Sequence, residues 1–250
     1  MSDVELNLST FIERFKKITE LGWVKTHRAG PTGIGKTLED LLGITENNIQ
    51  GPDYGVYELK SMRNNAKSML TLITKSPDSP PRANTALRLK FGYSSAAYDN
   101  GEQVLHATLS TQRFSPIHTT GYKLKIACDE SHIYIVSADA SGVETVEAQW
   151  DIDKLIEKMD KKLGDQFILV RADSRGTGAE EEFQFNEAYL LNGFSSAGII
   201  KLVNDGKILV DKRIGQYHSG KNKGKTHDHG TGFRIHERDY VYLFQRQKLV

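Results

Sequence analysis

The sequence predicts an α/β fold without internal repeats, and three observations support this prediction. Apolar residues recur at helical spacing over residues 4–21 and again over 150–163. Short runs rich in Val, Ile, Leu and Tyr between and after these segments are typical of strands. A length of 250 residues with 38% hydrophobic residues is enough to form a hydrophobic core in one large domain or in one domain with two lobes.

The individual elements follow from these patterns in chain order. Residues 4–21 predict an amphipathic helix that includes Phe11 and Phe15, and residues 37–43 predict a short helix that ends at Gly43. Further helices are predicted at 150–163, with Trp150 on the apolar side, and at 194–205 before Gly206. Strands are predicted at 56–61, 69–74, 103–110, 121–128, 132–138, 166–172 and 207–215, with a hairpin turn at 129–131 and loops at 76–84 and 215–232.

Composition excludes several classes of protein. Cys128 is the only cysteine, which excludes an internal disulfide and a multi-cysteine zinc site. Its neighbours predict a buried strand residue without chemistry. No apolar run approaches the length of a membrane span, and the start MSDVELNLST lacks the basic-then-apolar order of a signal sequence. We therefore expect a cytoplasmic protein with no membrane partner.

The net charge of +1 conceals a strong segregation of charge along the chain. Residues 60–92 carry seven Lys/Arg and one acid, whereas residues 129–187 carry fifteen Asp/Glu and six Lys/Arg. Residues 211–236 carry six Lys/Arg, four His and two acids. Two basic stretches around an acidic middle favour a polyanionic partner; ordinary solvated faces are the alternative explanation.

Residues 30–37, GPTGIGKT, match the pattern G-x-x-x-x-G-K-[ST] of a nucleotide-binding loop. That pattern requires a buried strand before it, and the preceding ELGWVKTHRA is too polar to supply one. We therefore expect no nucleotide. A glycine-rich turn that carries Lys36 before a helix N-terminus also suits a nucleic-acid phosphate. A plain turn with Thr37 capping the helix is the structural alternative.

The sequence GPDYGVYELKS at 51–61 contains the pattern P-D-x4-E-x-K. Glu58 and Lys60 lie two apart on a predicted strand and face the same side, and a bend after Pro52 can bring Asp53 beside Glu58. Two carboxylates form a hard oxygen site suited to Mg²⁺, and a neighbouring lysine can position or deprotonate a water. This combination suits phosphodiester hydrolysis; an exposed strand face with a salt bridge is the alternative. Nearby cations that could meet a phosphate are Arg63, Lys67 and Lys75.

Five stretches together carry a resemblance to a known family. They are TGIGKTLEDLL (32–42), PDYGVYELK (52–60), KSMLTLITKSP (67–77), ANTALRLKFG (83–92) and RIGQYHSGKNKGKTHDHGTGFRI (213–235). The chain resembles, nearly end to end, the MvaI/BcnI family of type II restriction endonucleases. These are monomeric, MutH-like members of the PD-(D/E)xK superfamily.

The resemblance implies a fold and a division of labour. It implies a restriction-endonuclease-like mixed central sheet flanked by helices, in two lobes around a DNA cleft. It further implies a mainly catalytic lobe over 1–110 that meets the minor groove, and a mainly DNA-recognition lobe over 111–250 that reads the major groove. The boundary between the lobes is approximate.

The resemblance also assigns residues. Asp53, Glu58 and Lys60 match the catalytic triad, with Asp53 and Glu58 as Mg²⁺ ligands, and Glu39 matches the extra acid of MutH-like nucleases. The positions that read bases are Asp211, Arg213, His227, His229 and Arg234. Asp211 and Arg213 share one strand face, and the two side-chain types suit cytosine N4 and guanine O6/N7. Phosphate contacts are expected at Lys36, Arg63, Lys67, Lys75, Lys221, Lys223 and Lys225.

Known members cut CC-x-GG sites, and the central pair divides them into two branches. The HDHG of residues 227–230 resembles the branch that reads A/T, whereas the other branch has Arg at the position of His229. GITENNI (43–49) and ELKSMR (58–63) look more like the C/G branch. We favour CCWGG. A cognate methyltransferase acting on the same site is also implied, with no protein partner in the cleavage reaction.

Three alternatives remain open at this stage. His227-Asp228-His229 could form a metal site by itself, although no Cys or further ligand is placed near it in the sequence. The chain could be a MutH-like strand-nicking enzyme of mismatch repair that depends on an activating partner. It could also be a DNA-binding protein without catalysis, against which the intact Asp53, Glu58 and Lys60 argue.

Overall fold

The computed structural model describes residues 7–44, 54–64, 69–94, 102–163, 166–217, 219–228 and 231–250. Contacts divide the chain into two compact units. Unit 1 comprises Met1–Ser68, Asp160–Ser195 and Tyr240–Val250, and unit 2 comprises Met69–Met159 and Ser196–Asp239. The lobe boundary expected at residue 110 lies inside unit 2, because each unit is assembled from segments that are distant in sequence.

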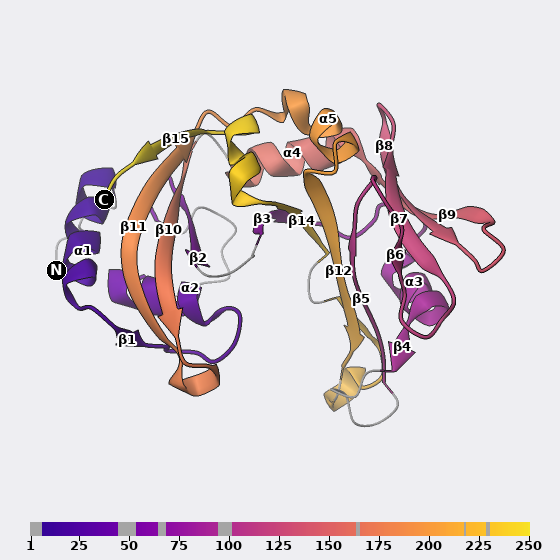
Figure 1. The fold of residues 1–250 in the computed structure, drawn as a ribbon, viewed down its shortest axis with the longest axis horizontal. Helices are drawn as coiled ribbons and strands as arrows, with labels where there is room; N and C mark the ends of the chain where they lie inside the picture. The colour runs from indigo at the N-terminus through magenta and orange to yellow at the C-terminus, as the bar shows by residue number, and fades with distance from the viewer. Residues whose placement is uncertain are drawn as a thin grey trace. The chain divides into compact units, whose positions relative to one another are not determined.

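Unit 1 is a mixed sheet with two helices on one face (Figure 1). Its strands are β1 (Val24–Lys25), β2 (Glu58–Arg63), β10 (Gln166–Arg175), β11 (Glu182–Asn192) and β15 (Gln245–Lys248). The order is β1-β11-β10-β2, with β15 also pairing β11. β2 runs parallel to β10, and the other pairs are antiparallel. The unit also contains helices α1 (Leu8–Glu20) and α2 (Gly33–Leu42) and the 3₁₀ turn η1 (Gly178–Glu180).

The core of unit 1 follows the periodicities of the sequence. Phe11, Phe15 and Ile18 of α1 recur at helical spacing and are buried. They pack with Ile34 and Leu38 of α2 against alternate residues of the sheet. On the sheet these alternate residues are Leu59, Ile168, Val170, Ala172, Phe183, Phe185, Ala188 and Leu190.

The opposite face of β10 is buried as well. Phe167 meets the Phe244 ring edge-on, with centroids 4.7 Å apart. β10 is thus apolar on both faces and internal to its sheet, as its run of apolar residues predicts.

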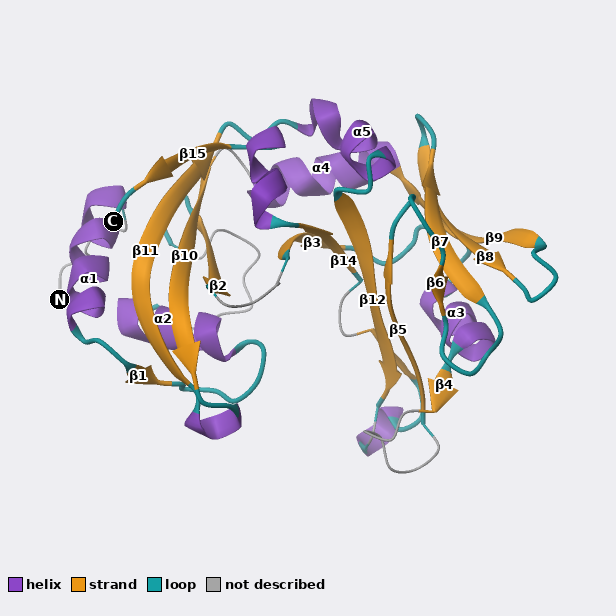
Figure 2. Cartoon of the chain, viewed as in Figure 1, coloured by secondary structure: helices purple, strands orange, loops and turns teal. Residues whose placement is uncertain are grey.

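Unit 2 contains two further sheets and most of the remaining helices (Figure 2). The first sheet has the order β3-β14-β12-β5-β4, with β13 also pairing β12. Its strands are β3 (Leu70–Thr74), β4 (Tyr93–Ser94), β5 (Gln103–Leu109), β12 (Ile208–Gln216), β13 (Thr226–Asp228) and β14 (Gly232–Ile235). The second sheet has the order β6-β7-β8-β9, formed by Ser115–Pro116, Lys123–Cys128, His132–Ala138 and Glu144–Asp151.

The helices of this part of the chain are short. They are α3 (Ala83–Phe91), α4 (Ile152–Leu163), α5 (Ile199–Asn204) and the 3₁₀ turns η2 (Ser196–Gly198), η3 (Gly220–Asn222) and η4 (Glu237–Tyr242). Both α4 and η4 continue from one unit into the other. None of the described helices combines the length and apolar character that crossing a membrane requires.

The mixed α/β prediction is confirmed, and so are several element ends. α2 ends at Gly43, whose φ of 73° is left-handed and favours glycine. The predicted hairpin is the antiparallel pair β7–β8. Cys128 is a half-buried residue of β7, and burial raises the pKa of its thiol to about 11, so it stays protonated at neutral pH.

Other predictions need correction. Trp150 lies in β9 and not in the following helix, which begins at Ile152. Its indole Nε1 donates to Lys75 O at 2.9 Å, and its ring meets Phe233 edge-on. The predicted helix 194–205 is reduced to η2 and α5. The predicted loop 215–232 contains β13, which pairs with β12.

Candidate active site and carboxylate–arginine cluster

Strand β2 presents Glu58 and Lys60 with one residue between them. In the parallel register with β10, Glu58 lies opposite Phe167 and Lys60 opposite Leu169. Lys60 Nζ donates to Glu58 Oε1, so the two side chains share a face, as their spacing predicts. We call these two residues the β2 pair.

The carboxylate of the β2 pair is buried, with Glu58 only 5% exposed. A buried carboxylate is costly unless cations or hydrogen bonds compensate it. A second cation supplies this compensation, because Lys162 Nζ of α4 lies 3.5 Å from the same oxygen, Glu58 Oε1. Sequence reasoning missed Lys162. The signal that could have found it is the basic end of an amphipathic helix that runs directly into β10.

The β2 pair fits a divalent metal by its donor chemistry. Glu58 holds a charged oxygen at the edge strand of the described sheet, and hard cations prefer such oxygens. Asp53, the predicted second carboxylate, lies outside the described residues. Among the residues that the structure describes, no group of three His, Cys, Asp or Glu is placed to hold a metal.

Glu39 lies on α2, one helical turn after Gly35. A Cβ built on Gly35 would lie 3.6 Å from Ser61 Oγ of β2 and 4.0 Å from Glu39 Oε1. A methyl group at Gly35 would make only ordinary van der Waals contacts, and the two distances show that this turn of α2 lies against β2. The structure thus places the acid of Glu39 next to the strand that carries the β2 pair.

The glycine loop has a structural explanation. The strand before it, β1, has two residues and is not buried, unlike the strand that a nucleotide loop needs. α2 begins at Gly33, inside the motif, so Thr37 is an interior residue and not the N-cap. Thr37 Oγ1 donates to Gly33 O at 2.8 Å and accepts from His27 N at 3.0 Å. These bonds fix the loop onto the helix.

Arg63, at the end of β2, is engaged within the protein. Its Nε and Nη2 donate to the two oxygens of Glu181 at 2.7 and 2.8 Å. Nη1 and Nη2 also donate to the carbonyls of Pro31 and Gly30 at 3.3 Å. A two-pronged bond to a carboxylate is among the strongest that arginine makes. The structure therefore favours a role for Arg63 in fixing the glycine loop over the phosphate contact expected from sequence.

Lys36 and Lys75 are also paired. Lys36 Nζ donates to Asp40 at 2.7 Å, and this bond, with a second from His27, lowers the pKa of Asp40. Lys75 Nζ donates to Asp78. Either lysine would have to leave or share its carboxylate to meet a phosphate. Lys67 lies outside the described residues.

Unit 2 gathers a second charged group around Asp211 of β12, which is 5% exposed. Arg213 Nε and Arg234 Nη1 donate to Asp211 Oδ2 at 2.8 and 2.7 Å. Thr108 Oγ1 of β5 donates to Asp211 Oδ1 at 2.9 Å. We call these four residues the Asp211 cluster. The structure brings Arg234 of β14 to Asp211 and Arg213, which the sequence analysis had placed on one strand face.

The two arginines of this cluster differ in exposure. The Arg213 side chain is 54% exposed, whereas that of Arg234 is 23% exposed. Arg234 also donates from Nη2 to Met69 O at 3.4 Å. Its Nε is buried and has no hydrogen-bond partner among the described residues.

The segment after β12 carries the other expected contacts. His227 of β13 lies opposite Gly215 and stacks on Tyr217, with ring centroids 4.3 Å apart. Lys221, Lys223 and Lys225 are exposed. His229 lies outside the described residues. Asp228 accepts from Ser76, Asn84 and Thr231, so this carboxylate serves the protein's own polar groups.

Comparison with known proteins identifies the chain. The sequence model of the MvaI/BcnI restriction endonuclease family matches residues 12–244. A solved structure of restriction endonuclease MvaI with its cognate DNA substrate has a TM-score of 0.86 and 34% identity, over 100% of both chains. A structure of MvaI in the absence of DNA has a TM-score of 0.61 and 35% identity, also over 100% of both. Among curated proteins, none matches the chain.

The fold and these matches define the class of protein, a site-specific DNA nuclease. The chain belongs to the MvaI/BcnI restriction endonuclease family. Restriction endonucleases generally use a divalent metal, which agrees with the donor chemistry of the β2 pair.

Proposed function

We propose that this chain is a type II restriction endonuclease of the PD-(D/E)xK superfamily that uses Mg²⁺ to hydrolyse both strands of duplex DNA at CC-x-GG. CCWGG is the narrower form of the proposal. The observation that carries it is the buried carboxylate of Glu58 with Lys60 on the same face of an edge strand. Similarity to an MvaI complex described as containing cognate DNA substrate supports duplex DNA as the substrate.

In this proposal Asp53 and Glu58 hold the metal ion, with Glu39 as a nearby extra acid. When bound, a divalent cation lowers the pKa of water and shields the charge of a phosphate. Lys60 lies beside Glu58 and can orient the attacking water by a hydrogen bond. Lys162, whose Nζ lies 3.5 Å from Glu58 Oε1, adds positive charge where an anionic phosphate would approach.

The Asp211 cluster is proposed to read bases. Arginine binds guanine O6 and N7 with two hydrogen bonds, and a carboxylate accepts from cytosine N4. One carboxylate holding two guanidinium groups fixes both forks in advance, which lowers the entropy lost on binding. Such side chains suit the G·C pairs of a CC-x-GG site. His227 and His229 are proposed for the remaining base contacts.

The exposed lysines of the segment after β12 are proposed to contact phosphates. Lys221, Lys223 and Lys225 are solvated, so they can pair with phosphates without breaking a buried contact. Lys36, Lys67 and Lys75 remain further candidates. We place the enzyme in the prokaryotic cytoplasm, where a cognate methyltransferase would protect the same site.

The proposal is tested on a panel of duplexes that differ only at the central position. CCAGG and CCTGG duplexes should be cut with Mg²⁺, whereas CCCGG, CCGGG and scrambled duplexes should not. Cleavage of all four central variants would support CC-x-GG but contradict CCWGG. Nicking that stops at one strand would favour the mismatch-repair type of enzyme, and binding without cleavage would favour an inactive DNA-binding protein.

We also expect a monomer that cuts the two strands in separate steps, because one chain supplies one β2 pair. Nicked circular plasmid should form first and be converted to linear DNA, at a rate proportional to enzyme concentration. The measurement is a time course on a plasmid with one site, at several enzyme concentrations. Linear DNA formed without a nicked intermediate, with second-order dependence on enzyme, would indicate a dimer.

A further inference from the structure

Lys212 lies on β12 between two residues of the Asp211 cluster, and its side chain is directed to other partners. The residue is 1% exposed, and its Nζ donates to Asn84 Oδ1 at 2.6 Å and to Thr231 Oγ1 at 2.8 Å. The ammonium also lies 5.6 Å from the centroid of the Trp150 ring. On β12, Asp211 and Arg213 are thus hydrogen-bonded to each other. Lys212 between them is buried and donates to other residues.

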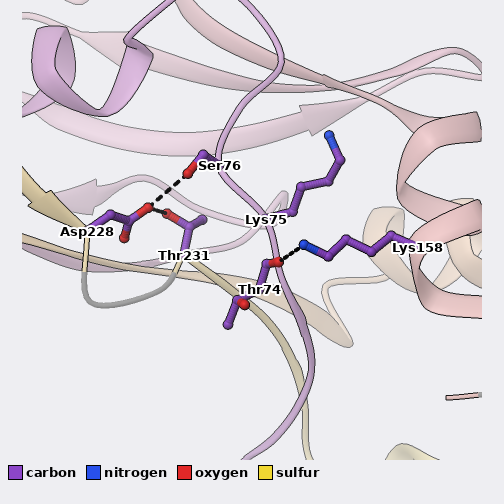
Figure 3. A pocket seen from close by; sticks show the side chains of 6 residues that line it. All are labelled: Thr74, Lys75, Ser76, Lys158, Asp228 and Thr231. Carbon is purple, nitrogen blue, oxygen red and sulfur yellow. Dashed lines mark hydrogen bonds between the residues drawn. The ribbon is translucent and has the colours of Figure 1, made fainter. Parts of the chain in front are cut away.

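The two acceptors of Lys212 both connect to Asp228. Asn84 Nδ2 donates to Asp228 Oδ2, and Thr231 Oγ1 donates to the same oxygen at 3.2 Å. Ser76 Oγ is a third donor at 3.1 Å, and Figure 3 shows Ser76 and Thr231 converging on this carboxylate. The ammonium therefore holds Thr231 directly, and it holds Asp228 through Asn84 and Thr231.

Packing alone does not fix the orientation of the Asp228 carboxylate and the Thr231 hydroxyl. Asp228 and Thr231 line a cavity of about 290 Å³, together with Thr74, Lys75, Ser76 and Lys158. Side chains beside a cavity have room to adopt other rotamers, so their hydrogen bonds decide their orientation. Asn84 and Lys212 supply those bonds from α3 and β12.

The buried charge is costly. Burial lowers the pKa of Lys212 to about 7, although the Asp228 carboxylate acts in the opposite direction. An apolar side chain of the same length would avoid this cost. The two hydrogen bonds to Asn84 and Thr231, and not a gain in stability, are therefore the feature of this lysine from which a role is inferred.

We propose that Lys212 is a positioning residue for DNA sequence recognition. Through Thr231 and Asn84 it fixes Asp228, the residue next to His227 on β13, while the neighbouring Asp211 and Arg213 face the bases. The inference rests on the proposed function, because it assigns a support to the proposed base-reading residues. It predicts that loss of the ammonium relaxes discrimination between sequences without weakening the attraction for DNA in general.

The test compares Lys212→Met with the wild-type protein. Methionine keeps an unbranched apolar stem but cannot donate to Thr231 or Asn84. The affinities for a duplex with the cleaved site and for the same duplex scrambled are measured without divalent metal. Cognate affinity should fall by about tenfold or more, while noncognate affinity and its salt dependence stay unchanged. Lys201→Met, which removes an exposed lysine of α5, is the matched control and should change neither affinity.

A second pair of variants keeps the test decisive if Lys212→Met does not fold. Thr231→Val removes the hydroxyl that accepts from Lys212 and donates to Asp228, whereas Thr231→Ser keeps it. The inference predicts relaxed discrimination in the valine variant and rescue in the serine variant. Unchanged discrimination in Lys212→Met, or equal behaviour of the two Thr231 variants, would overturn it. A wild-type protein that itself shows no sequence preference would contradict the proposed function instead.

Discussion

Strands β2 and β12 carry the same alternation of an acid and a base, Glu58-x-Lys60 in unit 1 and Asp211-x-Arg213 in unit 2. In both strands the acid is buried, at 5% exposure, and accepts a hydrogen bond from the base two residues later. The two sites differ in the cations that they gather. Glu58 is flanked by two lysines, whereas Asp211 is flanked by two arginines and a threonine.

This difference matches the two kinds of work that we propose. A lysine is a compact charge that can release its proton, which suits a water molecule that must be activated. An arginine keeps its charge and presents a rigid planar fork, which suits the edge of a guanine. The comparison teaches that an ion pair by itself says little about function, and that the type of cation is the informative part.

The positions of the two strands in their sheets also differ. In the described chain β2 is an edge strand paired only with β10, whereas β12 lies between β14 and β5 and also pairs with β13. An edge leaves one side of the strand open to a substrate and a metal. An internal strand is hydrogen-bonded on both sides, which fixes the geometry of the side chains that are proposed to contact bases.

The largest effect should come from the β2 pair. Lys60→Ala should reduce the single-turnover rate of cleavage by about 10²–10⁴-fold, because the attacking water loses the group that orients it. Glu58→Ala should lose metal-dependent cleavage as well, and its DNA affinity should stay equal or rise because a carboxylate that repels phosphate is gone. Lys60→Ala still leaves Lys162 near Glu58, so the variant should fold. Parallel loss of binding and cleavage would indicate a structural role for Lys60.

Next in size are the arginines of the Asp211 cluster. Arg213→Ala and Arg234→Ala should each cost about 1–3 kcal/mol of affinity for the cognate duplex, if each makes a two-pronged guanine contact. The measurement is equilibrium binding to cognate and scrambled duplexes. Arg175→Ala is a matched control in unit 1, since its side chain is 56% exposed and also pairs with a glutamate. Equal losses on both duplexes would show that the arginines contact phosphate.

Lys212 sharpens the comparison, because it is a lysine on the reading strand that faces the protein interior. With the folded pKa near 7 and the unfolded value near 10.5, the unfolded state binds more protons between these values, so stability rises with pH in this window. The free energy of unfolding, wild type minus Lys212→Met, should rise by about 2 kcal/mol between about pH 7 and pH 9. Urea unfolding at a series of pH values measures it. A difference that stays flat would mean that Lys212 keeps its proton throughout.

The smallest effect should come from the exposed lysines. Lys223→Ala should weaken cognate and scrambled DNA alike, and should reduce the slope of log affinity against log salt by about one. Binding at several salt concentrations measures this slope, with Lys201→Ala as the control. A change in the preferred sequence would show that Lys223 contacts bases, and would contradict its proposed role as a phosphate contact.

The sequence predicts features that depend on neighbours in the chain. The end of α2 at Gly43, the β7–β8 hairpin and the shared face of Glu58 and Lys60 all follow from local spacing. The sequence analysis did not predict β11. Its segment EFQFNEAYLLN contains several polar residues, and it is a strand because it pairs with β10 and with β15, which is distant in sequence. α3 was missed because a proline-rich loop precedes it without a helix cap of the usual kind.

Contacts between distant segments lie beyond sequence reasoning. Arg63 was expected to meet a phosphate, but its partner Glu181 comes from the segment before β11. Lys162 reaches Glu58 from the end of α4, and Lys212 joins α3 to the segment after β13. These contacts depend on how β2, β10 and β12 pair with other strands, and the spacing of residues along the sequence does not predict them.

The central claim is that residues of β2 carry out DNA cleavage and that residues of β12 recognise the bases. The most direct test measures equilibrium binding and single-turnover cleavage on one CCWGG duplex for Lys60→Ala and Arg213→Ala. We predict that Lys60→Ala binds like the wild type and cuts both strands about 10²–10⁴-fold more slowly. Arg213→Ala should bind weakly, yet at saturating enzyme it should cut at a rate within about tenfold of the wild type. If both variants lose binding and cleavage in the same proportion, the proposed division between the two strands is contradicted.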